Sequence, residues 1–297
     1  MAYSKDYHLT KNAKPAIRAY LGGSFDPVHN GHLQMALYVY QSLLPLAKQQ
    51  QRELQVSLLP NARSPFKADS TDPKHRLAML KLAIKDTPLQ INELELWQTP
   101  PVYTIDSVKT LRARYPHDSL IFIMGMDSAR SLDKWKHGLA LTDYVNLWVF
   151  NRLSIAENDP IINNNDENTI AQEKLINQDL VTSNLTALQS QLPIALQHFI
   201  TDSATDLVAP ALKSLTASSN LKNAAQGRIY IDPRPVAAIS STQVRQQLRK
   251  QGSQNATLQP INAIINPTVP NSFAKWLNPA VYQYIIDHQL YSAAQFR

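Results

Sequence analysis

The sequence predicts an α/β fold, a Rossmann-like doubly wound parallel sheet with a helical C-terminal part and a polar, partly helical insertion. Strand-like, helix-like and strand-like segments follow one another within the first sixty residues. This βαβ order builds parallel sheets with right-handed crossovers. Residues 120–124 (LIFIM) form a continuous apolar run, which is typical of a strand covered by helices on both faces.

The elements alternate along the chain. A short buried strand is expected at residues 16–21 (AIRAYL), followed by a helix with an apolar face. Helices are expected at residues 32–50, from Pro73 to before Pro88, at 103–115, after Ser241 and at 279–289. Further strands are expected at residues 54–59, 89–96, 120–124, 145–150 and 228–231.

The 297 residues are expected to form one domain that carries two insertions. The larger insertion, residues 154–226, contains NDPIINNNDENT, is rich in serine and asparagine, and has patches of helical pattern. The smaller insertion spans residues 251–271 and is polar.

Composition narrows the classes of function. Twenty-nine Lys and Arg against 23 Asp and Glu give a net charge of +6, yet residues 157–220 hold eight acidic and two basic residues. The remaining basic body suits anionic ligands, although a merely soluble surface is the plainer explanation of the charge. Without a basic run or an aromatic-interleaved basic patch, no nucleic-acid partner is expected.

Because the chain has no cysteine, no signal-like N-terminus and no apolar run near ~18 residues, we expect a cytoplasmic protein without a membrane partner.

The most informative stretch is GGSFDPVHNGHL, residues 22–33. Gly22 and Gly23 end the first strand, where a missing Cβ lets the backbone approach a ligand and take unusual dihedral angles. Ligands of open α/β sheets bind at such carboxyl ends. His29 and His32 would then lie one turn apart at a helix N-terminus, which favours phosphate oxygens.

Two other interpretations exist for this histidine pair, a surface accident or a zinc site without an evident third ligand. The complete string, however, resembles the first signature of the His-x-Gly-His nucleotidyltransferase superfamily, and the sequence looks most like its bacterial nicotinate-nucleotide adenylyltransferase branch. The resemblance implies that His29 and His32 bind the phosphates of ATP. It also places Gly22, Gly23, Ser24 and Phe25 at the ATP site.

A second motif, ISSTQVR, covers residues 239–245 immediately before a helix. Ser240, Ser241 or Thr242 could simply cap that helix. Their hydroxyls and the free N–H groups could equally cradle a phosphate, with Arg245 adding a bidentate fork. The motif is similar to the family's Ile-Ser-x-Thr-x-x-Arg signature, which implies that residues from Ile239 onward hold the β- and γ-phosphates.

Three further segments are similar to the nicotinate branch and imply an acceptor site. In LLPNARSPFK, Asn61 and Lys67 match the family, but Phe66 replaces a histidine that in relatives helps to hold phosphate. In VYTIDSVKTL, Thr104 would frame the pyridine ring. In FIMGMDSARSLDKW, Asp127 would lie near the adenosine and Trp135 would stack on the nicotinate ring, although a core tryptophan is the plainer interpretation.

The resemblance therefore implies transfer of AMP from ATP to nicotinate mononucleotide, giving nicotinate adenine dinucleotide and pyrophosphate. Mg²⁺ would be carried by ATP, with no metal site expected on the protein itself. An amide-preferring nicotinamide mononucleotide adenylyltransferase, a phosphopantetheine adenylyltransferase and a catalytically idle nucleotide-binding regulator are the alternatives. Intact His29, His32 and Arg245 argue against the regulator.

Overall fold

The structure is a computed structural model. It describes residues 14–62, 70–151, 186–208, 227–255, 273 and 275–291. The described strands form one seven-stranded sheet with the order β3-β2-β1-β4-β5-β7-β6, in which every neighbouring pair is parallel. This sheet confirms the predicted α/β class and its doubly wound topology, since the strand order reverses between β1 and β4.

The strand bounds follow the apolar runs of the sequence closely. The strands are β1 (Ile17–Gly23), β2 (Leu54–Pro60), β3 (Gln90–Ile91), β4 (Ser119–Gly125), β5 (Asn146–Phe150), β6 (Ile200–Thr201) and β7 (Ile229–Asp232). All seven residues of β4 and all five of β5 are buried, which agrees with their position in the middle of the sheet.

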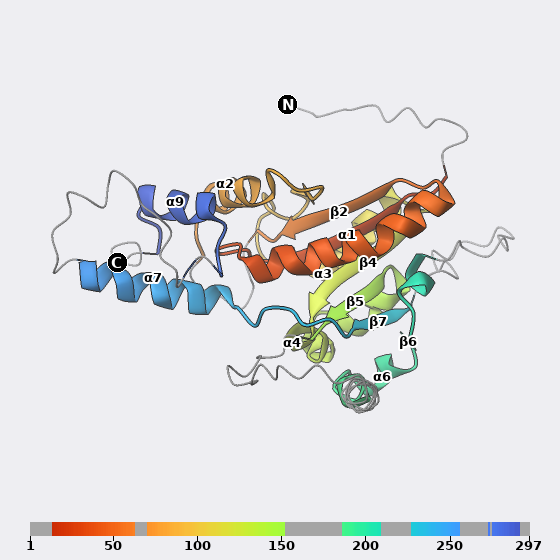
Figure 1. The fold of residues 1–297 in the computed structure, drawn as a ribbon. Coiled ribbons are helices and arrows are strands. Elements are labelled where there is room, and N and C mark those ends of the chain that lie inside the picture. Colours follow the sequence, from red (N-terminus) through yellow and green to blue (C-terminus); the bar gives the residue numbers. More distant parts are fainter. Residues whose placement is uncertain are drawn as a thin grey trace, which may run out of the picture.

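Helices cover both faces of the sheet. The α-helices are α1 (Asn30–Gln50), α2 (Pro73–Ile84), α3 (Thr104–Arg114), α4 (Met126–Ala129), α6 (Ile194–Gln197), α7 (Ser241–Asn255) and α9 (Pro279–Asp287). Three short 3-10 helices are η1 (Leu132–Lys134), η2 (Gly138–Asp143) and η3 (Ala204–Val208). Figure 1 shows α7 and α9 beyond the end of the sheet toward which β2 points.

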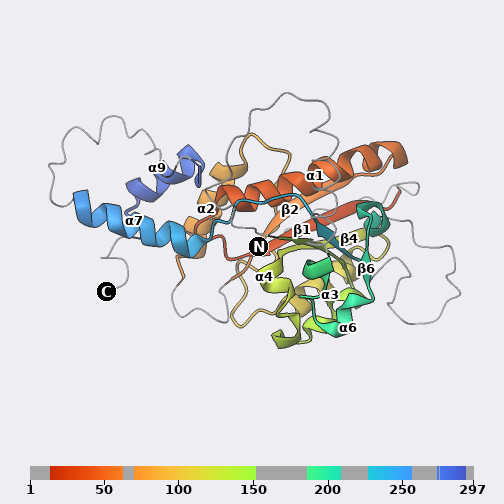
Figure 2. The same cartoon turned by 60° about the horizontal axis from the view of Figure 1, so that its bottom comes forward.

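Alternate residues of the central strands enter two different cores. Ile121 and Ile123 of β4 pack in the core that also contains α1, α2 and α9. Leu120 and Phe122, which point to the opposite face, pack with α3, α4 and α6. Figure 2 shows α1 on one side of the sheet and α3, α4 and α6 on the other. The period of two in side-chain direction thus builds two apolar layers from one run of sequence.

Two strands differ from the prediction. The expected strand at residues 89–96 is wrong beyond Ile91, because the Asn92 side chain accepts a hydrogen bond from the Leu94 N–H at 3.0 Å and turns the chain. In addition, β6 was not predicted. It comes from within the region interpreted as the larger insertion and pairs with β7 at the edge of the sheet.

The described part of that region, residues 186–208, contributes to both cores. Leu192 and Leu196 pack against the face that holds α3, and Val208 packs against the other face. The helix α7 continues to Asn255, into the first residues of the range interpreted as the smaller insertion. The rest of both ranges lies outside the described residues.

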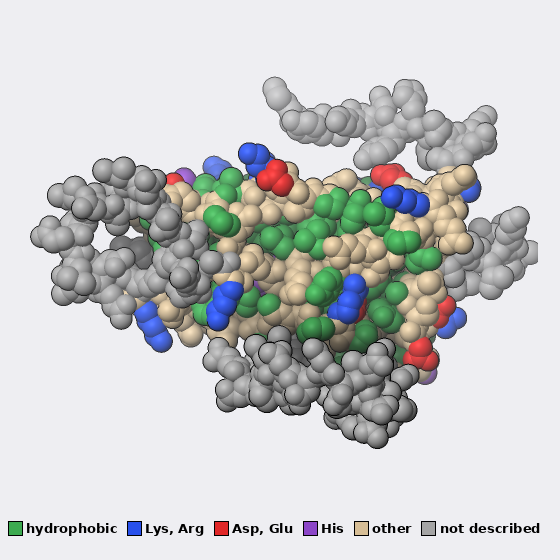
Figure 3. Space-filling model, viewed as in Figure 1, with side chains coloured by type: hydrophobic (Ala, Val, Ile, Leu, Met, Phe, Trp, Pro, Cys, Tyr) green, Lys and Arg blue, Asp and Glu red, His purple; other side chains and the backbone are tan. Residues whose placement is uncertain are grey.

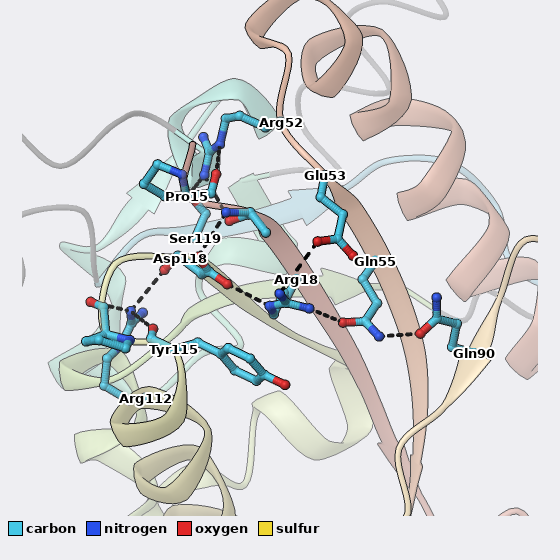
Figure 4. Close-up of polar contacts among 12 residues, drawn as sticks. Pro15, Arg18, Arg52, Glu53, Gln55, Gln90, Arg112, Tyr115, Asp118 and Ser119 are labelled. Carbon is cyan, nitrogen blue, oxygen red and sulfur yellow. Dashed lines mark hydrogen bonds and ion pairs between the residues drawn. The ribbon is translucent and has the colours of Figure 1, made fainter. Parts of the chain in front are cut away.

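Arginines hold the amino ends of the strands together (Figure 4). Arg18 donates to Asp118 at 2.6 Å, and Arg52 donates to the Ser119 hydroxyl at 2.7 Å and to the Ala16 carbonyl at 3.1 Å. Arg112 donates to the Asp118 carbonyl at 2.9 Å, and burial lowers the pKa of its guanidinium to about 10. These bonds satisfy strand termini at the end of the sheet away from the helix α7.

The surface carries no single dominant charge on the face shown in Figure 3, where basic side chains are scattered and apolar side chains gather over α1. Across the described residues, no helix combines the length and the apolar character needed to cross a bilayer.

Candidate functional site

A cavity of about 650 Å³ lies at the carboxyl ends of the central strands. It is bounded by the segments that follow β1, β2 and β4 and by the first residues of α3 and α7. Twelve of the predicted site residues line it: Gly22, Gly23, Ser24, His29, His32, Asn61, Thr104, Asp127, Trp135, Ser240, Ser241 and Thr242. The sheet therefore brings together segments that are up to about 220 residues apart in sequence, at the position where open α/β sheets bind ligands.

His29 and His32 lie at the N-terminus of α1, as predicted. His29 is the N-cap residue, and its backbone N–H donates to Nδ1 of His32 at 3.3 Å. The two imidazole rings stack with centroids 3.6 Å apart, and the Phe25 ring meets His32 edge-on at 4.9 Å. Both histidines are buried yet line the cavity, so they present fixed imidazoles to whatever occupies it.

The two glycines serve close packing rather than unusual dihedral angles, so that part of the prediction is wrong. A Cβ on Gly22 would lie 2.4 Å from Cζ of Phe122, and neither glycine has a positive φ. The positive φ in this loop falls on Phe25, at 47°. Phe25 is fully buried and does not line the cavity, and its ring packs against His32.

The second motif caps α7 and lines the cavity at the same time. The Ser240 hydroxyl accepts from the Gln243 N–H at 3.2 Å, while the Gln243 side chain accepts from the Ser240 N–H at 2.9 Å. This reciprocal pair is a capping box. Because Ser241 and Thr242 also line the cavity, the capping and the phosphate-cradle interpretations are compatible.

Arg245 links the two motifs directly. Its Nη1 donates to the Asp26 carbonyl oxygen at 2.5 Å, and its Nη2 lies 3.3 Å from the Thr242 hydroxyl. The Ser241 hydroxyl donates to the Pro27 carbonyl at 3.0 Å. Arg245 does not line the cavity, so its guanidinium contacts the first motif instead of facing the open space.

Trp135 lines the cavity and is flanked in sequence by two lysines. Lys134 and Lys136 both line the cavity and were not singled out from the sequence, although they flank Trp135 directly. The Lys136 ammonium lies 4.2 Å from the centroid of the Tyr103 ring and 3.7 Å from a carboxylate oxygen of Asp106, in the first turn of α3. Trp135 is partly buried against the second core, so its core role and its place in the cavity wall coexist.

Glu95 is another cavity residue that the sequence did not reveal. It is buried in the turn that replaces the predicted strand, and burial raises the pKa of its carboxyl, opposed in part by a hydrogen bond with Ser107. A single glutamate in an alternating segment gives no signal of its own, because its burial arises from the turn at Asn92.

A smaller hollow of about 310 Å³ adjoins the cavity and shares Asp127 and Ser240 with it. Ile239 lines this hollow rather than the main cavity, together with Gln191 and Arg130. Lys67 and Phe66 lie outside the described residues. Among the residues that are described, no group of three His, Cys, Asp or Glu side chains could hold a metal ion.

Comparisons with known proteins agree with this architecture. The family model described as cytidylyltransferase-like matches residues 20–247. A probable nicotinate-nucleotide adenylyltransferase from Idiomarina loihiensis is 29% identical over 281 residues, which cover 93% of this chain and 99% of the relative. The nicotinate-nucleotide adenylyltransferase of Bacillus subtilis is 43% identical over 118 residues, covering 38% of this chain and 58% of the relative.

Among solved structures, a nicotinic acid mononucleotide adenylyltransferase from Plasmodium falciparum, complexed with NaAD, aligns with a TM-score of 0.55. The alignment covers 93% of this chain and 97% of that one at 16% identity. At this identity the similarity concerns the fold, and it agrees with the parallel sheet described above.

Proposed function

Since this chain belongs to the cytidylyltransferase-like family, we propose that it joins nicotinate mononucleotide to the AMP part of ATP and releases pyrophosphate. The products are nicotinate adenine dinucleotide and pyrophosphate, and the reaction belongs to NAD biosynthesis. The relatives that align over 93% and 94% of the chain carry the name of this activity.

One observation carries the proposal. His29 and His32 of the first motif line the same cavity as Ser240, Ser241 and Thr242 of the second. Two helix N-termini, those of α1 and α7, therefore open into one space, and each favours phosphate oxygens. A nucleoside triphosphate carries the negative charge that both N-termini favour.

The reaction needs positioning and charge stabilisation rather than a general base, because the phosphate of the acceptor is already ionised at neutral pH. An oxygen of that phosphate attacks the α-phosphorus of ATP in line, and the bond to the pyrophosphate oxygen breaks. His29 and His32 stabilise the charge that develops on the α-phosphate and the leaving group. Ser241 and Thr242 hold the departing pyrophosphate.

Arg245 acts in this scheme through the first motif. Since Nη1 already donates to the Asp26 carbonyl, its bonds keep the loop before His29 against α7. Most polar groups in the described wall of the cavity are hydroxyls, imidazoles and lysines, with Glu95 and Asp127 as the carboxylates. This donor set suits phosphates, so Mg²⁺ would be held by the phosphates of ATP, where it offsets their negative charge.

The part of the cavity wall around Trp135 fits a flat ring that carries a carboxylate. Trp135 offers an aromatic face, Thr104 begins α3, and Lys134 and Lys136 supply positive charge. A pyridine carboxylate accepts hydrogen bonds and is attracted to a cation, whereas an amide is neutral. The lysines beside Trp135 therefore favour the acid over the amide nucleotide.

A pyrophosphate-release assay with ATP tests the proposal. Three acceptors are compared: nicotinate mononucleotide, its amide and phosphopantetheine. We expect the highest kcat/KM with the nicotinate compound and no release with phosphopantetheine. Preference for the amide or for phosphopantetheine would assign the chain to a sister activity, and binding of ATP without release under any acceptor would make it a regulator.

A further inference from the structure

A residue near the C-terminus, Tyr291, donates a hydrogen bond to the loop between β1 and α1. Asp26 lies in this loop, three residues before His29, and its side chain points into the protein, where it is 4% exposed. One carboxylate oxygen accepts from the Tyr291 hydroxyl at 2.7 Å, and the other accepts from the Thr71 N–H at 3.1 Å. Both oxygens of a buried carboxylate are therefore satisfied.

The surroundings of Tyr291 keep its hydroxyl protonated, so that it can donate a hydrogen bond. Its side chain is fully buried, and its backbone has a positive φ of 63°. Burial, and then the charge of Asp26, raise the pKa of its hydroxyl well above the usual value, so the phenol keeps its proton. A tyrosine at the far end of the chain thus gives one hydrogen bond to one loop carboxylate.

The same loop is held from two other sides. The Arg245 guanidinium donates to the Asp26 carbonyl, and the Ser241 hydroxyl donates to the Pro27 carbonyl. Arg76, which is fully buried, donates to the carbonyls of Ser24 and Asn61 at 2.8 Å each. The loop is therefore fixed through its backbone carbonyls and through the side chain of Asp26.

The C-terminal segment also contacts the first residue of α1. The Asn30 N–H donates to the Trp276 carbonyl at 2.7 Å. Trp276 and Tyr291 flank α9, so the two ends of this helix reach the two sides of the loop that carries the histidines. Packing alone does not require the Tyr291 hydroxyl, because a phenylalanine would fill the same apolar space. The hydrogen bond to the buried Asp26 does require it.

We infer that Tyr291 is a positioning residue for the transfer reaction: its hydroxyl holds Asp26, and Asp26 sets the loop that aims His29 and His32 into the cavity. The inference rests on the proposed function for its kinetic consequence. Small displacements of groups that stabilise a transition state cost rate out of proportion to their cost in stability. The effect should therefore be on kcat more than on binding.

The test compares Tyr291→Phe with a matched control, Tyr282→Phe. Tyr282 is a buried tyrosine of the same segment whose ring packs against Phe273. We expect Tyr291→Phe to lower kcat roughly tenfold or more, with KM for both substrates within about twofold. We expect Tyr282→Phe to leave kcat unchanged, whatever it does to the midpoint of thermal unfolding.

Asp26→Asn completes a double-mutant cycle with Tyr291→Phe. If the hydroxyl acts through Asp26, the double variant loses no more kcat than the worse single variant. Independent, multiplying losses would contradict the inference, as would a fall in thermal stability with unchanged kcat.

A readout without turnover separates this inference from the proposed function. Imidazole nitrogen spectra of the free protein report the environments of His29 and His32 directly. We expect their signals to shift in Tyr291→Phe and to stay in place in Tyr282→Phe. Unshifted signals in both variants would overturn the positioning role, even if the wild-type protein proved active on another acceptor. If Tyr291→Phe shifted the signals but the wild-type protein proved inactive, only the proposed function would be overturned.

Discussion

At the scale of single residues, the stacked imidazoles of His29 and His32 are the groups that we propose to act on the phosphates of ATP. Their ring centroids are 3.6 Å apart and both rings are buried, so neither can reorient freely. A fixed donor costs little reorganisation when charge develops on a phosphate. Each imidazole is thus a preorganised part of the site rather than a surface side chain.

Replacing His32 by alanine removes one of these donors. We expect His32→Ala to lower kcat by roughly a hundredfold or more, the size seen when one transition-state donor is removed. Steady-state pyrophosphate release measures the change, and circular dichroism checks that the variant is folded. A folded His32→Ala protein with near-normal turnover would refute the assignment.

Lys136, which lines the cavity beside Trp135, is the residue that we propose to favour the acid over the amide acceptor. We expect Lys136→Met to lower the ratio of kcat/KM for nicotinate mononucleotide over its amide by roughly threefold to tenfold, as for one partly solvated charge pair. Lys109→Met is the matched control, because Lys109 lies over the Tyr144 ring at 5.6 Å and does not line the cavity. Equal effects of both variants on the ratio would show that only net charge matters.

The motif residues could be predicted from the sequence because their chemistry is local. His29 and His32 are three residues apart, and a helix start places such a pair on one turn. Tyr291 and Arg245 contact the loop through Asp26, from positions more than 200 residues away. No spacing in the sequence encodes such bonds, since they depend on how α7 and the C-terminal segment dock on the folded sheet.

At the scale of elements, the short helices η1 and η2 hold the aromatic wall of the cavity. The Trp135 N–H donates to the Leu132 carbonyl at 3.2 Å, and the Gly138 N–H donates to the Trp135 carbonyl at 3.1 Å. A Cβ on Gly138 would lie 2.0 Å from the Leu132 carbonyl oxygen and 2.8 Å from Cβ of Trp135. The turn around Trp135 therefore requires glycine at this position.

Gly138→Ala is expected to push this turn apart. We expect it to destabilise the protein by about 1–3 kcal/mol, as for other overpacked sites, and to raise KM for nicotinate mononucleotide more than KM for ATP. Denaturant unfolding and steady-state kinetics measure the two effects. Leu139→Ala, at the exposed neighbouring residue, serves as the control. If Gly138→Ala raised only the KM for ATP, Trp135 would not contact the acceptor.

Element boundaries were predictable where packing is uniform and not where a side chain turns the chain. The strand β4 is buried throughout, and its apolar run in the sequence matches it closely. The strand β6 has two residues and no pattern of its own, because it forms only by pairing with β7. The turn at Asn92 shortened β3 through a hydrogen bond that competes with strand pairing.

At the scale of the whole molecule, the two ends of the sheet have different roles. The amino end is held by Arg18, Arg52 and Arg112, which bind strand termini and Asp118 (Figure 4). The carboxyl end carries the cavity and the converging helix N-termini. The sheet between the two ends packs into two apolar cores, which fix the strands that carry the site.

The free energy of unfolding of the protein should fall at alkaline pH. Burial raises the pKa of the Tyr20 hydroxyl, and burial together with Asp26 raises that of Tyr291, relative to the ordinary value of 10.0. In the unfolded chain both groups ionise near pH 10, whereas in the folded protein they stay protonated. The contribution is therefore complete below pH 10 and is lost as the pH rises, by up to about 1.4 kcal/mol per pH unit for each group.

Urea unfolding between pH 8 and pH 11 measures this dependence. We expect Tyr20→Phe to show a shallower fall of the free energy of unfolding than the wild type above pH 10. Identical slopes in the two proteins would mean that Tyr20 does not stay protonated in the folded state.

A crystal structure with a non-hydrolysable ATP analogue tests the central claim most directly. We expect its triphosphate to lie between the imidazoles of His29 and His32 and the first turn of α7, with phosphate oxygens within hydrogen-bond distance of Ser241 and Thr242. A triphosphate bound elsewhere, or in contact with only one of the two helix N-termini, would contradict the account.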